Sequence, residues 1–254
     1  MRLLMQALAV LVLLALAAGP ALADEIVSLK VGYLSLSPKG SFAATVDGVG
    51  TRIDMENDLN FKDSRQMMAE AALQLGDFHL SAGYLPIKFS GSGTLTRSIN
   101  FNGRDYSAGT RVDSDVDIKL YDVGLTYYLV NLNNLPVRLQ IGPEIAVKIA
   151  DADLSVTDLS SGIKEETTGT VPVPTVGGRF RVALADYLGV VGRVGYMAYG
   201  GNHFLDADAQ VEFSPLPLVG IFAGYRYFDL HVDHSATYLD ATFSGPYGGA
   251  FVRF

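Results

Sequence analysis

The chain of 254 residues contains no cysteine and no tryptophan, and it has few basic residues. Without cysteine it has neither disulfide bonds nor thiolate metal ligands, and it offers no site for the acyl group of a lipoprotein. Its 19 lysine and arginine residues are outnumbered by 27 aspartate and glutamate residues, for a formal net charge of −8. A basic face for nucleic acid is therefore absent, and we expect no nucleic-acid partner.

Only the first 23 residues contain a long apolar run, and they are typical of a secretory signal peptide. Arg2 supplies the positive start, Leu3 to Ala18 are apolar apart from Gln6, and Ala21 and Ala23 are small residues at the spacing that signal peptidase requires. We therefore predict cleavage before Asp24. The alternative is a retained membrane anchor, but the apolar run is short for a helix that spans a membrane, which needs about 20 residues. The mature domain is predicted to be residues 24–254, with a net charge of −9 because the removed segment carries only one charge.

After residue 23 the chain has no apolar run of transmembrane length, yet its mean hydropathy is positive, at +0.24. Apolar residues instead alternate with polar ones, as in Val137 to Ile149, which predicts strands with one apolar and one polar face. A soluble sandwich and a membrane barrel share this pattern. In a bilayer every backbone polar group must pair, so a membrane protein without spanning helices has to close its sheet into a barrel.

The alternation, taken with the signal peptide, the terminal Phe254 and the lengths of the connections, predicts an all-β, antiparallel, up-and-down transmembrane barrel of about ten strands, with eight or twelve as alternatives. Short turns and longer polar segments alternate between the strands, as they do between the two ends of a bacterial barrel. The segment 43–61 is a candidate for an extra hairpin. The predicted strands are 25–36, 64–75, 78–88, 117–130, 136–149, 172–184, 188–197, 204–213, 218–229 and 240–254.

The last eight residues contain Tyr247, Gly249 and Val252, and they end on the aromatic Phe254. This pattern resembles the C-terminal assembly signal of bacterial outer-membrane β-barrel proteins. With the signal peptide and the strand pattern, the mature chain resembles the small barrels of the OmpA-, OmpX- and OmpW-like kind. The resemblance implies a location in the Gram-negative outer membrane. The partners it implies are outer-membrane lipid, lipopolysaccharide and the barrel assembly machinery, and we expect a monomer.

Aromatic residues are spaced as expected for two girdles at the membrane surfaces. On the predicted lipid-facing side, Phe78 and Phe254 fall at one rim, whereas Tyr33, Tyr84 and Tyr121 fall at the other. The sorting of aromatic side chains by depth supports the barrel, although these residues are also good strand formers.

Many charged residues alternate with the lipid-facing positions and are predicted to point into the lumen. A lumen about ten strands wide is narrow, and unpaired charges inside it would be costly. We therefore predict a salt-bridged network that fills the lumen, with a narrow water path between the pairs as the alternative. Its predicted members are Glu70, Arg138, Glu144, Lys148, Arg179, Arg181, Arg193, Asp206, Asp208, Glu212 and Arg226.

Two groups of histidines are candidates for chemistry. His79-Leu80-Ser81 resembles the His-x-Ser pair of outer-membrane lipid A deacylases, but both side chains are expected inside the lumen, and Gly93 occupies the position of the expected acid. The structural interpretation, a lumen histidine in a hydrogen-bond network, is favoured.

The second group is His231 and His234, with His203 and Asp229 close by in the predicted topology. It offers ligands to a divalent metal, or a His–Asp pair such as omptin proteases carry at the barrel rim. No other omptin motif is found, and a solvated loop is favoured.

We therefore expect no enzymatic activity and no cofactor. The favoured function is a structural role with surface interactions. A passive channel for small or apolar solutes is the alternative, and a lipid-modifying enzyme or a protease is less favoured.

Overall fold

The computed structural model describes residues 26–44, 52–95, 98–101, 103–132, 137–216, 218–234 and 237–254. These residues form strands and turns. The predicted signal peptide and its cleavage residues Ala21, Ala23 and Asp24 lie outside them, so cleavage stays a prediction. No helix within the described ranges has the length and apolar character needed to cross a membrane.

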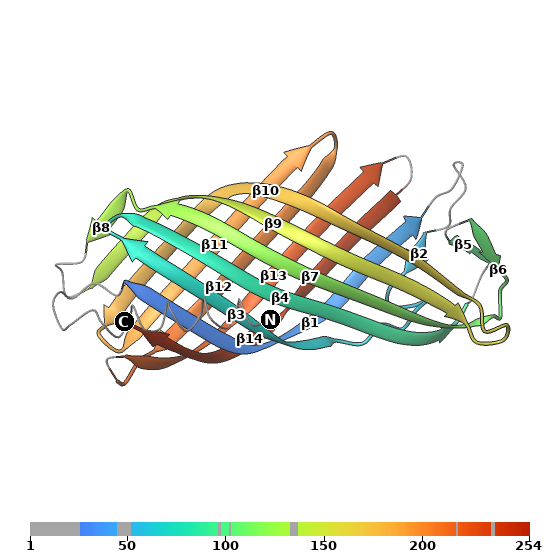
Figure 1. The fold of residues 1–254 in the computed structure, drawn as a ribbon, viewed down its shortest axis with the longest axis horizontal. Coiled ribbons are helices and arrows are strands. Elements are labelled where there is room, and N and C mark those ends of the chain that lie inside the picture. Colours follow the sequence, from blue (N-terminus) through green and yellow to red (C-terminus); the bar gives the residue numbers. More distant parts are fainter. Residues whose placement is uncertain are drawn as a thin grey trace, which may run out of the picture.

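Ten long antiparallel strands close into a barrel, which confirms the predicted fold class and strand number (Figure 1). Each strand pairs with its neighbours in the chain, and the last pairs with the first. The ten strands are β1 (Val27–Ala44), β3 (Ser64–Leu75), β4 (Phe78–Thr94), β7 (Arg111–Tyr127), β9 (Arg138–Asp158), β10 (Lys164–Ala185), β11 (Leu188–Tyr199), β12 (Asn202–Phe213), β13 (Val219–His234) and β14 (Thr237–Arg253).

Among the described residues, four short strands lie outside this ring. One strand pairs with the end of β1, two form a small separate hairpin, and one pairs with the start of β9. They are β2 (Ile53–Asp54), β5 (Ile99–Phe101), β6 (Arg104–Tyr106) and β8 (Val130–Leu132).

The two ends of the barrel differ. One end, here called the turn end, carries β8, the chain's C-terminus and short connections such as Gly76-Asp77 (Figure 1). Gly76 has a φ of 58°, a conformation that glycine adopts without steric cost. The opposite end, here called the hairpin end, carries β2, β5 and β6. Its connection between β11 and β12 is Gly200-Gly201, with φ values of 60° and 88°, as expected for a two-residue hairpin turn.

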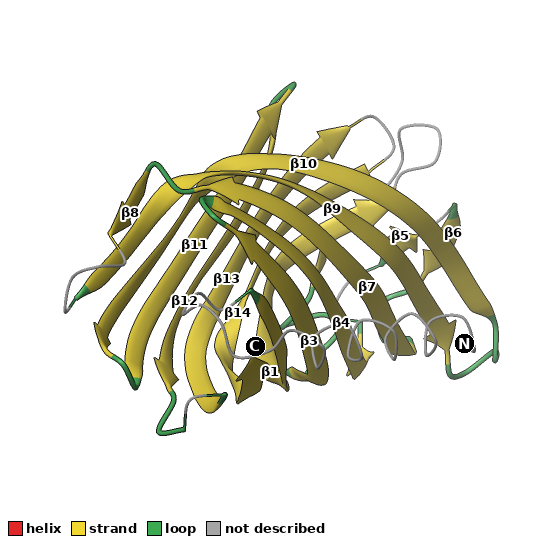
Figure 2. Cartoon of the chain, turned by 60° about the vertical axis from the view of Figure 1, so that its left-hand side comes forward, coloured by secondary structure: helices red, strands yellow, loops and turns green. Residues whose placement is uncertain are grey.

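Strands extend far into the segments that were predicted as long loops. β1 continues to Ala44, β4 to Thr94, and β9 and β10 form a hairpin that turns between Asp158 and Lys164 (Figure 2). The 22 residues of β10 span roughly 70 Å at the usual rise of a strand. The apolar band of an outer-membrane barrel is only about 25 Å tall, so much of the hairpin end projects beyond it.

The polarity of the strands inverts along the barrel, which explains why these extensions were missed. Near the turn end, outward residues of β4 are apolar, from Phe78 to the exposed Tyr84. Toward the hairpin end the outward positions become polar, from Lys88 to Ser92, while the inward Ile87 and Phe89 are buried. The alternation continues with a period of two, but the polar and apolar residues exchange faces. The row of outward apolar residues therefore ends before the strand does.

The wall is incomplete beside the β9–β10 hairpin. The pairing of β10 with β11 runs from the turn end only to Val176, whereas its pairing with β9 continues to Lys164. Pro172 and Pro174 lie just beyond that point and carry no N–H group for a ladder. The prolines therefore favour a free strand edge there.

Candidate functional site

The lumen of the turn half is crossed by a network of buried charges. Its centre is Lys148, whose Nζ atom lies 2.7 Å from a carboxylate oxygen of Asp122 and 2.7 Å from one of Asp206. Arg226 donates to Asp206 at 2.8 Å, and Arg193 donates to Asp122 at 2.5 Å. These residues come from five strands, β7, β9, β11, β12 and β13, because alternate residues of each strand point inward. The network therefore bridges the lumen rather than following its wall.

A second set of ion pairs lies closer to the turn end. Lys30 of β1 lies 3.1 Å from Glu212 and 3.6 Å from Glu70, and Arg253 also donates to Glu212. Arg181 is 3.7 Å from the same Glu212 carboxylate. One glutamate is thus shared by cations of three strands, β1, β10 and β14, and it ties the seam between first and last strand to the opposite wall.

Arg179 and Arg193 connect the two sets. Arg193 donates to Glu144, which also accepts a hydrogen bond of 2.8 Å from the Thr126 hydroxyl group. Arg179 lies 3.6 Å from Glu144 and 3.8 Å from Glu70. With Asp208, which accepts a hydrogen bond from a tyrosine, the network has seven cations and six anions. Opposite charges are almost balanced, as burial in a narrow lumen requires.

Most predicted lumen residues lie in this network. Nine make ion pairs within it: Glu70, Glu144, Lys148, Arg179, Arg181, Arg193, Asp206, Glu212 and Arg226.

Asp208 joins the network through the Tyr247 hydroxyl group, which lies 3.2 Å away. Arg138 differs from the prediction. It is the first residue of β9, and it reaches the exposed Asp186 of the neighbouring turn, 3.5 Å away, because it stands at the rim rather than inside.

The predicted network did not include Lys30, Asp122 and Arg253, although Arg253 was expected to face the lumen. The signal that would have found them was present, because each alternates with lipid-facing neighbours: Asp122 follows the exposed Tyr121, and Arg253 precedes the exposed Phe254. The other members were predicted because alternate residues of a strand point inward, and the same alternation places all three of these residues in the lumen.

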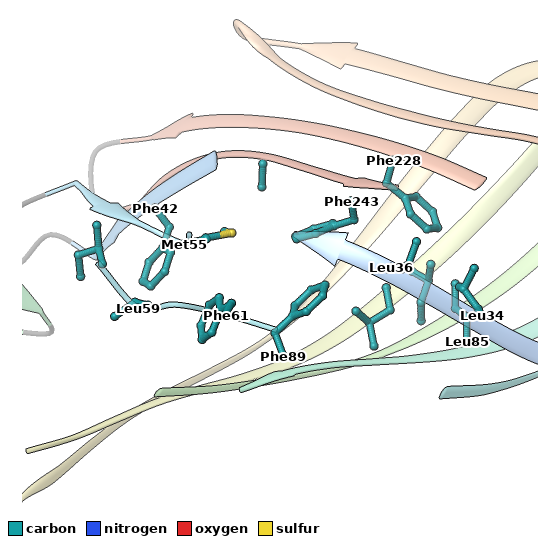
Figure 3. Close-up of a cluster of buried hydrophobic side chains, with 14 of the residues drawn as sticks. Leu34, Leu36, Phe42, Met55, Leu59, Phe61, Leu85, Phe89, Phe228 and Phe243 are labelled. Carbon is teal, nitrogen blue, oxygen red and sulfur yellow. The ribbon is translucent and has the colours of Figure 1, made fainter. Parts of the chain in front are cut away.

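The lumen of the hairpin half is apolar instead of charged. Figure 3 shows Phe61, Phe89 and Phe243 packed together, with Leu36 and Phe228 beside them. The ring centroids of Phe89 and Phe243 lie 5.2 Å apart, and those of Phe61 and Phe89 lie 6.2 Å apart. Above the charged layer, the barrel is therefore filled like the interior of a soluble protein.

The chain segment between β1 and β3 contributes to this apolar layer. Ile53, Met55 and Leu59 are buried against it, and Asp54 accepts hydrogen bonds from the backbone N–H groups of Glu56 and Asn57 that close the turn. The predicted extra hairpin of 43–61 thus takes the form of β2 and a tight turn, as far as its described residues show, and it packs into the mouth of the barrel.

Outward aromatic residues form pairs at two depths. Phe78 and Tyr127 pair at the turn end with ring centroids 4.9 Å apart, and Tyr84 pairs with Tyr121 at 5.2 Å, six residues further along β4. All four side chains are exposed. The two levels agree with the predicted girdles of a membrane barrel.

The residues of the C-terminal motif are divided between the two faces of β14. Phe254 is exposed on the outside, whereas Tyr247 is buried in the lumen and bonded to Asp208. Gly249 pairs with Gly32 across the seam, where a side chain would collide with the backbone of Val31. Gly249 therefore serves close approach of β14 and β1, a role separate from that of the exposed terminal ring.

The two histidine groups lie in different surroundings. His79 is inside the lumen with Nδ1 3.1 Å from Gln74, and Ser81 is buried beside it in the sheet. His203 and His231 stack outside, 5.4 Å between centroids, and each lies 3.4 Å from a carboxylate, of Asp229 and Asp240 respectively.

The side chain of His234 lies outside the described part. Within that part, no three His, Asp or Glu side chains are grouped so as to hold a metal ion.

Solved structures show what this chain is similar to. The outer membrane protease OmpT from Escherichia coli superposes with a TM-score of 0.52 at 9% identity, over 92% of this chain and 99% of the other. The translocator domain of the autotransporter NalP from Neisseria meningitidis gives 0.42 at 14% identity, over 100% and 96%. The attachment invasion locus protein Ail of Yersinia pestis gives 0.38 at 14%, over 91% and 100%.

No protein-family model matches the sequence, and no curated protein matches it. The likeness to OmpT concerns the fold alone, because 9% identity carries no information on activity. At the level of fold, the resemblance to bacterial outer-membrane β-barrels is confirmed.

Proposed function

We propose that this protein is an integral outer-membrane β-barrel of a Gram-negative bacterium with a structural and surface-interaction role, without enzymatic activity, and with a lumen closed to solutes. The proposal rests on one observation: two different layers of side chains fill the lumen, one after the other along the barrel axis. The charged network around Lys148 crosses the turn half, and the apolar cluster around Phe89 fills the hairpin half. A solute would have to break both layers.

The outer wall supports the membrane location. Between the two levels of aromatic pairs, the outward positions of β7 are apolar, and beyond Tyr121 they are Lys119, Asp117 and Asp115. The first part suits contact with lipid, and the second part suits water and the polar surface of the outer leaflet, where lipopolysaccharide is the expected neighbour. In this orientation the turn end is periplasmic and the hairpin end is extracellular.

The surface role follows from the shape of the hairpin end. It continues the hydrogen-bonded wall of the barrel, since β9 and β10 stay paired up to the pair of Thr157 and Lys164. Contact with the surroundings would thus be made by strand faces and by the free edge of β10. The histidine groups favour no catalytic role, because His79 is enclosed in the lumen and the His203–His231 pair lies half-buried on the outer face, where each ring is paired with a carboxylate.

Single-channel conductance in a planar bilayer tests the closed lumen. The purified protein is inserted, and insertion is verified by protection of the membrane strands from protease added on both sides. We expect no steady openings. Steady ohmic openings of the inserted protein would contradict the closed lumen and favour the passive channel instead.

A further inference from the structure

A cavity of about 40 Å³ opens into the lumen at the turn end, among the ion pairs around Glu212. This is roughly three times the space that one water molecule requires. Its lining carries four cations and two anions, a local charge of +2, in a chain whose net charge is −8. These charged residues are Lys30, Glu70, Arg179, Arg181, Glu212 and Arg253. The excess of positive charge favours an anion in the cavity.

The guanidinium group of Arg179, in the lining, has a buried N–H donor that lacks an acceptor. Its side chain is only 7% exposed, and its Nη1 atom has no hydrogen-bond partner. The Glu144 carboxylate lies 3.6 Å from that atom, close enough for ion pairing but too far for a hydrogen bond. A buried guanidinium donor without an acceptor is costly, so an acceptor in the cavity would stabilise the site.

His79, in the same lining, lacks a hydrogen-bond donor rather than an acceptor. The amide nitrogen of Gln74 donates to the Gly76 carbonyl at 2.7 Å, which leaves the Gln74 carbonyl oxygen to face Nδ1 of His79 at 3.1 Å. Nδ1 therefore carries the proton, and Nε2 of the neutral ring is an acceptor. Nε2 is buried and has no partner. It needs a hydrogen-bond donor.

We propose that the cavity binds a protonated oxyanion, namely hydrogen phosphate or the monoanion of a small phosphate monoester, which keeps one O–H. Such a group accepts from Arg179 through an oxygen and donates to His79 through its O–H, and its negative charge matches the local +2 of the lining. Sulfate has acceptor oxygens but no O–H donor at neutral pH, and chloride lacks both features. The phosphodiester of a phospholipid also lacks the O–H. The site should therefore discriminate among anions of similar charge by a single hydrogen bond to His79.

Inorganic phosphate, sulfate and chloride at equal ionic strength are the probes. Binding to the protein folded in detergent micelles is measured by isothermal titration calorimetry at pH 7. We expect saturable binding of phosphate and about tenfold weaker binding of sulfate, the factor that one hydrogen bond of about 1.4 kcal/mol supplies. Chloride should show no saturable heat. Glycerol 3-phosphate, a monoester, separates the two sources. Its second pKa of about 6 leaves mostly the dianion, without an O–H, at pH 7, so it is also titrated at pH 6. A site that admits only free phosphate will not bind it at either pH.

Three variants assign the interactions. His79→Leu should abolish the preference for phosphate over sulfate, and Arg179→Gln should weaken both. Arg138→Gln is the matched control, because it also removes one cation from the turn end but lies outside the cavity. Retention of the folded barrel is checked by heat modifiability on gels.

If Arg179→Gln does not fold, the comparison of wild type with His79→Leu decides alone. Equal binding of phosphate and sulfate by the wild type, an unchanged preference in His79→Leu, or no saturable phosphate binding would each overturn the proposal. Weakening in Arg138→Gln equal to that in Arg179→Gln would overturn it as well, since it would indicate a general charge effect.

Discussion

Lys148 and Asp206 meet in the middle of the barrel with 2.7 Å between Nζ and the carboxylate oxygen, although their strands, β9 and β12, are not neighbours. Both side chains are almost inaccessible, at 1% and 2% exposure. Two strands lie between them in the wall, so the ion pair braces the barrel across its interior. Removal of Lys148 would leave the buried Asp206 with Arg226 as its remaining ion-pair partner and break the link to the opposite wall.

Lys148→Met should therefore destabilise the barrel strongly. Asp122 and Asp206 would lose the cation that both contact, and the expected cost in unfolding free energy is about 3–5 kcal/mol. Lys119→Met, on the outward face of β7, should stay within about 0.5 kcal/mol of the wild type. Urea unfolding in lipid vesicles measures both. Equal effects of the two variants would show that Lys148 does not act as an interior brace.

The seam between β14 and β1 should tolerate no side chain at Gly249. A Cβ atom there would lie 2.1 Å from the Val31 carbonyl oxygen, so we expect Gly249→Ala to cost about 1–3 kcal/mol or to prevent closure. Gly83→Ala is the matched control, because its Cβ would have no neighbour nearer than 3.8 Å, and we expect it to be neutral or slightly stabilising. Heat-modifiability midpoints of the two variants provide the comparison.

Fold class and lumen residues followed from the sequence wherever the alternation kept one sign. Asp206 and Glu212 were identifiable because apolar outward residues flank them on β12. The strands of the hairpin half were not identifiable. There the outward residues are polar, as at Asp115, and the inward ones apolar, as at Val116, so the segment resembles a polar loop. Arg138 was misjudged because parity gives the face of a strand but not the depth along it.

The turn half of the barrel should stay folded when the apolar cluster of the hairpin half is disrupted. Phe89 stacks between Phe61 and Phe243, and Phe89→Ala would open a cavity at a cost of about 3–5 kcal/mol. We expect this variant to stay heat-modifiable while its hairpin end becomes sensitive to protease. Phe89→Leu, which fills most of the space, should remain resistant. Loss of the folded barrel in Phe89→Ala would show that the two halves are not independent.

The tip of the β9–β10 hairpin should loosen in acid. The hydroxyl group of Ser161 and the backbone N–H groups of Ser160 and Ser161 donate to Asp158, and they hold the pKa of its carboxyl group below the usual value. A lowered pKa means that the turn is stabilised above the unfolded pKa of about 4. That contribution is lost as the pH falls through the folded pKa. Amide hydrogen exchange at Ser160 and Ser161, corrected for its intrinsic pH dependence, should show falling protection below about pH 4.

Asp158→Asn provides the control for this titration. It keeps an oxygen acceptor but cannot ionise, so its exchange protection should be independent of pH across the same window. Equal pH dependence in the wild type and in Asp158→Asn would assign the loosening to another group.

The terminal ring should matter for assembly rather than for the stability of the finished barrel. The backbone of Phe254 closes the seam through hydrogen bonds with Ile26 and Val27, at 2.7 to 3.1 Å, and these do not depend on the side chain. The ring itself is 41% exposed on the outer wall at the turn end, where it packs little but is accessible to other proteins. We therefore expect Phe254→Asp to be exported and then to accumulate as a degraded or aggregated periplasmic species.

Two comparisons isolate the role of the ring. Arg253→Ala is unsuitable as a silent control, because Arg253 is buried and bonded to Glu212. Leu216→Asp is suitable, since it places the same charge on an exposed residue at the same end of the barrel, and it should assemble normally. Fractionation of cells, followed by immunoblotting, measures the outer-membrane level of each variant. If Phe254→Asp, refolded from urea into detergent, regains the heat-modifiable form while its level in cells is low, the defect lies in recognition by the assembly machinery. A normal outer-membrane level of Phe254→Asp would remove the basis for calling the last strand an assembly signal.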